Sequence, residues 1–227
     1  MTFTLLAADP GHGLLAAATA SRSLAVGNAV IAVDPAVGAV ASQAWTNRAL
    51  RARMLDALAA GRVPAEVMAE VPRWDEGAAL RQVAALLPDG RGEARTGEGT
   101  TPWAGAVVRP GVVAVGNLLT GPEVLDAVVA RFGALSSAAG EDAEGGWEAT
   151  TAADDVLAAF ARRVVAAMQA GEDAGGDRRG RQSAAVVVSR RRPERAHPPE
   201  LEIDLRVDDA AEPLHELARL LETQLAG

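Results

Sequence analysis

The 227-residue sequence contains no cysteine, no lysine, no tyrosine and only three histidines. Without cysteine there are no disulfides and no thiolate metal ligands, which is typical of cytoplasmic proteins. His12, His197 and His215 lie far apart along the chain, so we expect neither a metal site nor a cofactor. Without lysine, the chain has no catalytic or Schiff-base lysine.

Long apolar runs and excess positive charge are also missing. No apolar stretch reaches the roughly 18 residues of a membrane span, and no basic stretch precedes the apolar start of the chain, so we expect no signal peptide and no membrane partner. The formal net charge of −8 argues against binding a nucleic-acid backbone. We therefore expect one cytoplasmic domain, residues 1–227, whose partner is a small molecule or a peptide-like compound.

Hydrophobic periodicity and turn residues divide the chain into strands and helices. Strands are predicted at residues 2–8, 14–20, 30–33, 36–43, 82–87, 92–96, 104–108, 112–117, 183–189 and 202–207. Helices are predicted at residues 45–60, 64–71, 122–132, 153–170 and 214–225. Residues 136–151 are rich in Gly, Ser, Glu and Ala, and we expect a flexible insertion there.

The order of these elements predicts the fold class. Helices do not alternate with strands, which argues against a doubly wound parallel sheet. The first strands are apolar on both faces, as in a sheet that is covered on each side. We therefore predict an α+β fold in which two mainly antiparallel sheets stack between outer helices, a four-layer α-β-β-α sandwich.

The second residue carries the main chemical signal. Thr2 follows Met1, and an initiator methionine is normally removed when a small residue follows it. Removal would leave Thr2 with a hydroxyl and a free α-amine, whose unperturbed pKa is about 7.7–8.0. Such an amine can activate the hydroxyl of its own residue as a nucleophile. The alternative interpretation is that Thr2 is an ordinary strand residue.

Several motifs are spread over nearly the whole chain. They are Thr2-Phe3-Thr4 with Asp9-Pro10, the run from Val37 to Trp45, Pro102-Trp103-Ala104-Gly105, Gly116-Asn117, the run from Gly175 to Ala184, and the run from Asp204 to Asp208. In this order they resemble an uncharacterised bacterial and archaeal family, domain of unknown function 1028, which is assigned to the N-terminal nucleophile (Ntn) hydrolases. The Thr-led strand, the Gly-His turn and Gly27-Asn28 resemble the proteasome-like branch of that superfamily.

This resemblance implies an Ntn-type sandwich and amide hydrolysis through Thr2. The chain also departs from the pattern. Proteasome-like hydrolases use an Asp on the second strand and a Lys to poise the threonine, and this chain has neither at the expected places. Where relatives tend to carry His and Gln, this chain has Ala106 and Val115.

On this basis Thr2 would supply nucleophile and base, Asp177 and Arg178 would adjust the proton affinity of its amine, and Asn117 would contact the oxyanion. The candidate substrate-binding residues are Gln43, Trp45, Asn47, Trp103, Arg206 and Asp208. Structural alternatives stand beside these roles. Asn47 suits a helix N-cap equally well, the tryptophans suit a core, and Arg206 with Asp208 suits an ion pair with the Asp177 loop.

Two functions follow. The first is a hydrolase of a small amide or peptide-like substrate, with Thr2 at the mouth of a cleft beside the Gly175–Arg179 loop. The second is an inactive member of the same fold that binds a metabolite or a partner. A weaker third interpretation is a structural subunit of a homo-oligomer.

Overall fold

The computed structural model describes residues 2–141 and 152–226. The strands are β1 (Thr2–Asp9), β2 (Leu14–Ser21), β3 (Ile31–Asp34), β4 (Gly38–Ala44), β5 (Arg81–Leu86), β6 (Gly92–Thr96), β7 (Gly105–Arg109), β8 (Val112–Asn117), β9 (Ser183–Arg190) and β10 (Ile203–Val207). The helices are α1 (Val26–Ala29), α2 (Ala49–Ala59), α3 (Pro64–Trp74), α4 (Glu123–Glu141), α5 (Ala152–Asp173) and α6 (Pro213–Leu225), with a 3-10 helix η1 (Ala78–Leu80).

The strands form two sheets in which every neighbouring pair is antiparallel. The six-stranded sheet has the order β10-β9-β2-β1-β8-β7, and the four-stranded sheet has the order β3-β4-β5-β6. β1 lies inside the larger sheet, between β2 and β8. Its hairpin with β2 closes at the Asp9-Leu14 pair, around the predicted Pro-Gly turn.

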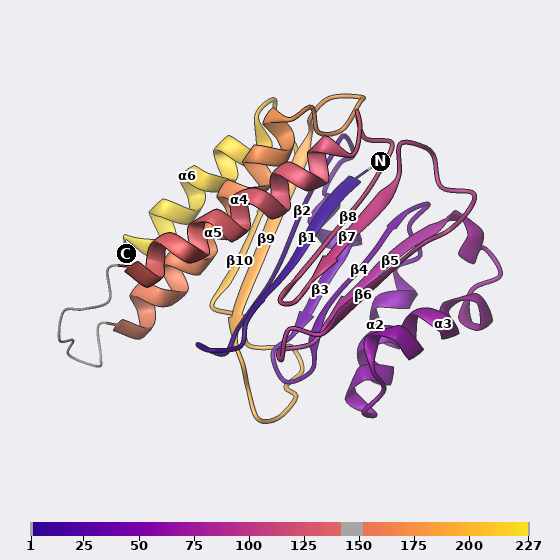
Figure 1. Cartoon of the computed structure of the whole chain (residues 1–227), viewed down its shortest axis with the longest axis horizontal. Coiled ribbons are helices and arrows are strands. Elements are labelled where there is room, and N and C mark those ends of the chain that lie inside the picture. The colour runs from indigo at the N-terminus through magenta and orange to yellow at the C-terminus, as the bar shows by residue number, and fades with distance from the viewer. Residues whose placement is uncertain (1, 142–151, 227) are drawn as a thin grey trace.

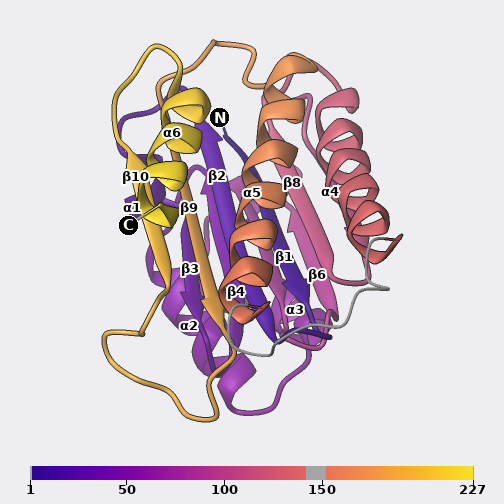
Figure 2. The same ribbon diagram turned by 90° about the vertical axis from the view of Figure 1, so that its left-hand side faces the viewer.

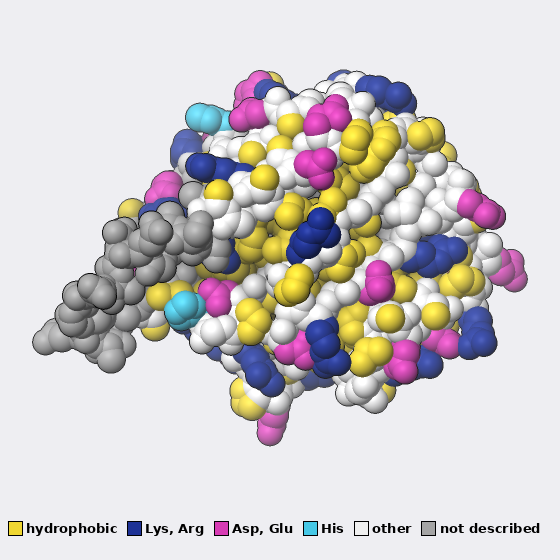
Figure 3. All heavy atoms as spheres, viewed as in Figure 1, with side chains coloured by type: hydrophobic (Ala, Val, Ile, Leu, Met, Phe, Trp, Pro, Cys, Tyr) yellow, Lys and Arg dark blue, Asp and Glu magenta, His cyan; other side chains and the backbone are white. Residues whose placement is uncertain are grey.

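Helices cover the outer face of each sheet (Figures 1 and 2), and on the face shown in Figure 3 charged side chains of both signs are scattered among hydrophobic ones. One core forms where α4, α5 and α6 pack on the six-stranded sheet, through residues such as Leu125, Met168 and Leu217. Another forms where α2 and α3 pack on the four-stranded sheet, through residues such as Met54 and Val67. These helices are amphipathic, and each buries its apolar face on a sheet.

The two sheets face each other across a third core. Because side chains alternate along a strand, β1 points Phe3 and Leu5 toward the helices and Leu6 and Ala8 toward the other sheet. Every strand inside the stack therefore needs apolar residues on both faces, as the sequence indicated. The inter-sheet layer is apolar over much of its length, but at the end where β1 begins its side chains become polar.

The predicted α+β class, with two antiparallel sheets, is confirmed. The short helix α1 was not predicted, because four residues are too few for a periodic pattern. Residues 136–141, expected in the flexible insertion, continue α4, in keeping with their alanines, which favour helix. Residues 142–151 lie outside the described residues. Within the described ranges, none of the helices combines the length and hydropathy needed to cross a bilayer.

The inter-sheet core should carry much of the stability. Leu6 is 0% exposed in this layer, so Leu6→Ala removes buried apolar surface and leaves a cavity. We expect a loss of about 2–5 kcal/mol in the free energy of unfolding, measured by urea denaturation. Leu24→Ala is the control, because Leu24 is 67% exposed, and its effect should stay within about 0.5 kcal/mol. Equal effects would contradict this account of the core.

Candidate functional site at the start of β1

Polar side chains gather at one end of the inter-sheet layer, where β1 begins. We call this set the polar cluster: Thr2, Thr4, Thr19, Ser21, Gln43, Gln82 and Asn117, each at most 5% exposed. Its members come from β1, β2, β4, β5 and β8. Buried polar groups are unfavourable unless they are hydrogen-bonded. A dense group of them inside a core therefore makes this end of the layer the candidate functional site.

Thr2 lies at the centre of the polar cluster. Its hydroxyl donates to Ser21 Oγ at 3.2 Å. Its carbonyl oxygen accepts from Gln43 Nε2 at 3.1 Å and from Asn117 Nδ2 at 3.4 Å. The strand register produces this arrangement, because Thr2 pairs with Asn117 of β8 and lies one step beyond the Phe3-Ala20 pair of β2. The hydroxyl and the carbonyl of Thr2 are therefore both hydrogen-bonded to residues of other strands.

Gln82 joins the two sheets through its amide. Its Oε1 accepts from Gln43 Nε2 at 2.8 Å and from Asn117 Nδ2 at 3.1 Å. Its Nε2 donates to the carbonyl of Gly116 at 2.8 Å and to that of Gly105 at 3.0 Å. β5 is thereby tied to β7 and β8 of the other sheet without any charged group.

Thr4 and Thr19 extend the polar cluster one step deeper into the layer. Thr4 Oγ1 donates to Gln43 Oε1 at 2.6 Å and lies 2.9 Å from Thr19 Oγ1. Thr19 in turn donates to the carbonyl of Phe3 at 3.3 Å. The amide oxygen and nitrogen of Gln43 are both engaged, as a buried amide requires. The predicted residue Gln43 is thus part of the cluster, in a position that holds Thr2.

The Asp177 loop lies beside the start of β1. Asp177 is 8% exposed and accepts from the backbone N–H groups of Arg22 and Arg179, at 2.8 Å each. It also forms an isolated bridge with Leu119. Arg22 follows β2 and Leu119 follows β8, the two strands that flank β1. In Figures 1 and 2 the segment between α5 and β9 passes close to the N-terminus. The structure thus brings the predicted loop and Thr2 into one region.

Glycines allow the loop to approach so closely. A Cβ on Gly175, whose φ is +121°, would lie 2.2 Å from Thr120 Oγ1, and Gly176 has a φ of +53°. Other residues adopt such angles rarely. Asp177 pairs with Arg179 Nη2 at 3.2 Å, whereas Arg178 donates to the carbonyl of Pro102 at 3.2 Å, because consecutive side chains of a turn diverge.

Asn47 and Trp45 do not join the polar cluster. Asn47 Oδ1 accepts from the N–H of Ala49 at 3.1 Å, and its Nδ2 donates to Asp75 Oδ2 at 2.8 Å. These contacts fix Asn47 at the start of α2, one residue before the N-cap position, which Arg48 holds. Trp45 is 65% exposed. It follows Gln43 by two residues, beyond the end of β4.

The remaining candidates are distributed over other surfaces. Trp103 is half-buried against the helix-covered core, and its carbonyl accepts from Leu119 N, which brings it near the Asp177 loop. Arg206 pairs with Asp204 at 2.9 Å rather than with that loop, because both project from the same face of β10. Asp208 is exposed. An Arg206 or Asp208 ion pair with the Asp177 loop is therefore not formed.

Two of our site predictions need extension or correction. Sequence reasoning missed Ser21 and Gln82 as site residues. Ser21 could have been found from the sequence, since continuing the register of the predicted hairpin places it opposite Thr2. Gln82 comes from another sheet, and no local signal in the sequence indicates it. Thr2 was expected at the mouth of a cleft, yet it is 5% exposed in the chain that carries Met1. Thr2 pairs with Asn117 of β8 and its hydroxyl is bonded to Ser21 of β2, so the residue lies within the layer.

Fold and site together define an α+β protein of two stacked antiparallel sheets with a neutral polar cluster between them. Residues 2–217 match the model of DUF1028, a family of unknown function, and the chain belongs to this family. The sequence resemblance to that family is thereby confirmed.

A solved structure supports the same fold. The chain is similar to the crystal structure of protein SPO2555 from Silicibacter pomeroyi, which is also assigned to DUF1028. The two are 31% identical, the match covers 100% of this chain and 87% of that chain, and the TM-score is 0.80. No curated protein matches this chain.

Gln82 allows a direct test of the polar cluster. Gln82→Leu leaves Gln43 Nε2 and Asn117 Nδ2 each without one acceptor, at about 1–3 kcal/mol for a buried group left unsatisfied. We expect the free energy of unfolding, measured by urea denaturation, to fall by about 2–4 kcal/mol. Gln224→Leu makes the same chemical change at an exposed position, where it removes one hydrogen bond, to the Glu202 carbonyl, and should lower stability by no more than about 1 kcal/mol. Equal losses would show that the cluster adds nothing.

Asp75, which accepts a hydrogen bond from Asn47, should make the stability of the fold depend on pH. A hydrogen bond from Arg81, at 2.8 Å, is the main cause that lowers the pKa of the Asp75 carboxyl from 3.8 to about 2. A carboxyl with a lowered folded-state pKa stabilises the fold above its unfolded pKa, and this contribution is lost as pH falls toward the folded value. Wild type should therefore lose on the order of 1–2 kcal/mol more than Asp75→Asn between pH about 4 and pH about 2.

Urea denaturation at several pH values measures this difference. A pH dependence of Asp75→Asn that is identical to that of wild type would refute the assignment.

Proposed function

We propose that this protein is an Ntn-type amide hydrolase, in which removal of Met1 exposes Thr2 as the nucleophile toward a small amide or peptide-like substrate. One observation carries the proposal. The buried polar side chains of the inter-sheet layer converge on Thr2, the first described residue of β1, and hold both its hydroxyl and its carbonyl. A strand that merely began with threonine would not need this arrangement.

The chemistry would follow from the two groups of Thr2. Its Oγ attacks the carbonyl carbon of the substrate while its α-amine takes the hydroxyl proton, giving a tetrahedral intermediate. The C–N bond then breaks, the proton passes to the departing amine, and an ester remains on Thr2. Water, activated by the same amine, cleaves the ester and restores the hydroxyl.

The polar cluster would act by positioning. Ser21 Oγ accepts from the Thr2 hydroxyl and so directs it. Gln43 and Asn117 hold the Thr2 carbonyl. Because Asn117 Nδ2 is engaged by the Thr2 carbonyl and by Gln82, we assign Asn117 a positioning role in place of the oxyanion contact expected from the sequence. The Asp177 loop brings Arg178 and Arg179 to the same region, and a nearby guanidinium lowers the pKa of an amine and keeps more of it neutral.

A second candidate function rests on the burial of Thr2. At 5% exposure, with its hydroxyl already bonded to Ser21, Thr2 would remain closed to substrate if Met1 stayed in place. Ala106 and Val115 also stand where relatives tend to carry His and Gln. In that case the protein would be an inactive Ntn-type fold that binds a metabolite or a partner.

The mass of the intact protein distinguishes the two functions. We expect bacterially expressed protein to lack Met1, and an electrophilic β-lactone to add one acyl group to Thr2, detected by mass spectrometry of the intact and digested protein. Thr2→Ala should abolish this labelling and any hydrolysis in a screen of acyl-amides, a loss of at least about 10³-fold.

Thr46→Ala is the matched control, because Thr46 is an exposed threonine, and its labelling should equal that of wild type. Retention of Met1, or labelling that persists in Thr2→Ala, would exclude the hydrolase and favour the inactive binding protein.

A further inference from the structure

Two cavities adjoin along β3, an edge strand of the four-stranded sheet. One, of about 490 Å³, lies against the start of α2 and includes Arg48. The other, of about 350 Å³, reaches α1 and β10. Both are lined by Ala32, Val33, Arg51 and Pro199, so they form one groove, which we call the Arg51 groove.

Positive charge in the Arg51 groove is not fully compensated. Its carboxylates are already committed: Asp34 and Asp56 hold Arg195 at 2.6 and 3.0 Å, and Asp204 holds Arg206 at 2.9 Å. Across residues 2–141 and 152–226, neither Arg48 nor Arg51 forms an ion pair. Arg51 instead donates to the backbone carbonyl of Ile31 at 2.8 Å. Four arginines and three aspartates line the groove, so one positive charge remains in excess there, in a chain whose net charge is −8.

The placement of these two arginines is unfavourable in the absence of an anion. They lie at the N-terminal end of α2, whose first turn contains no acidic residue, and the helix dipole disfavours cations there. Burial lowers the pKa of Arg51, and the neighbouring charges of Arg48 and Arg206 lower it further. An anion bound between Arg48 and Arg51 would relieve both the like-charge repulsion and the conflict with the dipole.

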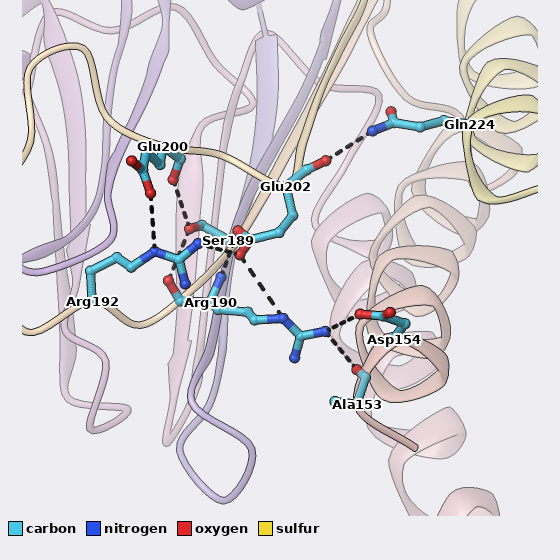
Figure 4. A network of polar contacts seen from close by, with 8 residues as sticks. All are labelled: Ala153, Asp154, Ser189, Arg190, Arg192, Glu200, Glu202 and Gln224. Atoms are coloured by element: carbon cyan, nitrogen blue, oxygen red, sulfur yellow. Dashed lines mark hydrogen bonds and ion pairs between the residues drawn. The ribbon is translucent and has the colours of Figure 1, made fainter. Parts of the chain in front are cut away.

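The wall opposite α2 is held firmly in place. It is formed by the loop between β9 and β10, whose ends are joined by the network in Figure 4. Arg192 pairs with Glu202 at 2.7 Å, and Ser189 Oγ donates to the carbonyl of Glu200 at 3.3 Å. Further along the loop, Arg195 bridges to β3 and α2 through Asp34 and Asp56. Such a preformed groove suits a small ligand.

We propose that the Arg51 groove binds a phosphorylated small molecule, with its phosphoryl group between Arg48 and Arg51. A phosphate monoester carries a charge of about −1.5 to −2 at pH 7, which matches two guanidiniums better than a single carboxylate does. The organic part of the ligand would extend past Arg51 into the second cavity, lined by Ile31, Pro198 and Leu201. This site shares no lining residue with the polar cluster and does not depend on the proposed hydrolase activity.

Calorimetric titration of the full chain tests the proposal with phenyl phosphate, inorganic phosphate and benzoate at one ionic strength. We expect phenyl phosphate to bind more tightly than either of the others. Arg51→Gln and Arg48→Gln should each weaken it roughly 10- to 100-fold, the loss of one charged hydrogen-bond partner. Arg53→Gln is the matched control on the same helix, because Arg53 donates to the Trp74 carbonyl and does not line the groove.

Three results would overturn the proposal: no heat of binding at about 10 mM phenyl phosphate, equal weakening in Arg53→Gln, or benzoate binding as tightly as phenyl phosphate. Tighter binding of inorganic phosphate than of phenyl phosphate would overturn the role of the second cavity. Should Arg51→Gln fail to fold, Arg48→Gln decides the outcome, since Arg48 is exposed and its loss removes charge without disturbing the core.

Discussion

The structure depends on one interaction between its sheets, the hydrogen bonding of the Gln82 amide. Gln82 is 0% exposed, yet its oxygen accepts from Gln43 and Asn117 and its nitrogen reaches two backbone carbonyls of the opposite sheet. Apolar contacts elsewhere in the layer are tolerant of small shifts, whereas a buried amide with several partners tolerates few relative positions. The amide network therefore sets how the two sheets align where β1 begins.

That alignment has a chemical consequence for Thr2. Gln43 and Asn117, themselves held by Gln82, fix the carbonyl of Thr2, and Ser21 fixes its hydroxyl. The side chains of the network are amides and hydroxyls, which do not ionise across the physiological range. Charge enters from the Asp177 loop, which lies across the ends of the strands flanking β1. The polar cluster thus orients Thr2, whereas the charged groups near it belong to the Asp177 loop.

The use of arginine as the sole basic residue other than histidine also shapes the molecule. Planar guanidiniums form the ion pairs that hold the β9–β10 loop and Arg206 in place. Arg48 and Arg51 have no carboxylate partner among the described residues, so arginine leaves a local positive charge there on a protein that is acidic as a whole. The polar cluster and the Arg51 groove therefore differ in character, one neutral and buried, the other cationic and open.

The sequence by itself determined the ten strands that the described residues form, the longer helices, the stacking of two antiparallel sheets and the family, but not the short helix α1 or the full length of α4. Apolar periodicity and turn residues are local, and the motifs from Thr2 to Asp208 can be read in order. Only the tertiary structure decided which polar residues meet. Gln82 joins the site from another sheet, Asn47 bonds to Ala49 and Asp75, Arg206 pairs with Asp204, and Thr2 is buried. Those outcomes depend on how sheets and loops pack across long sequence separations, which no local pattern encodes.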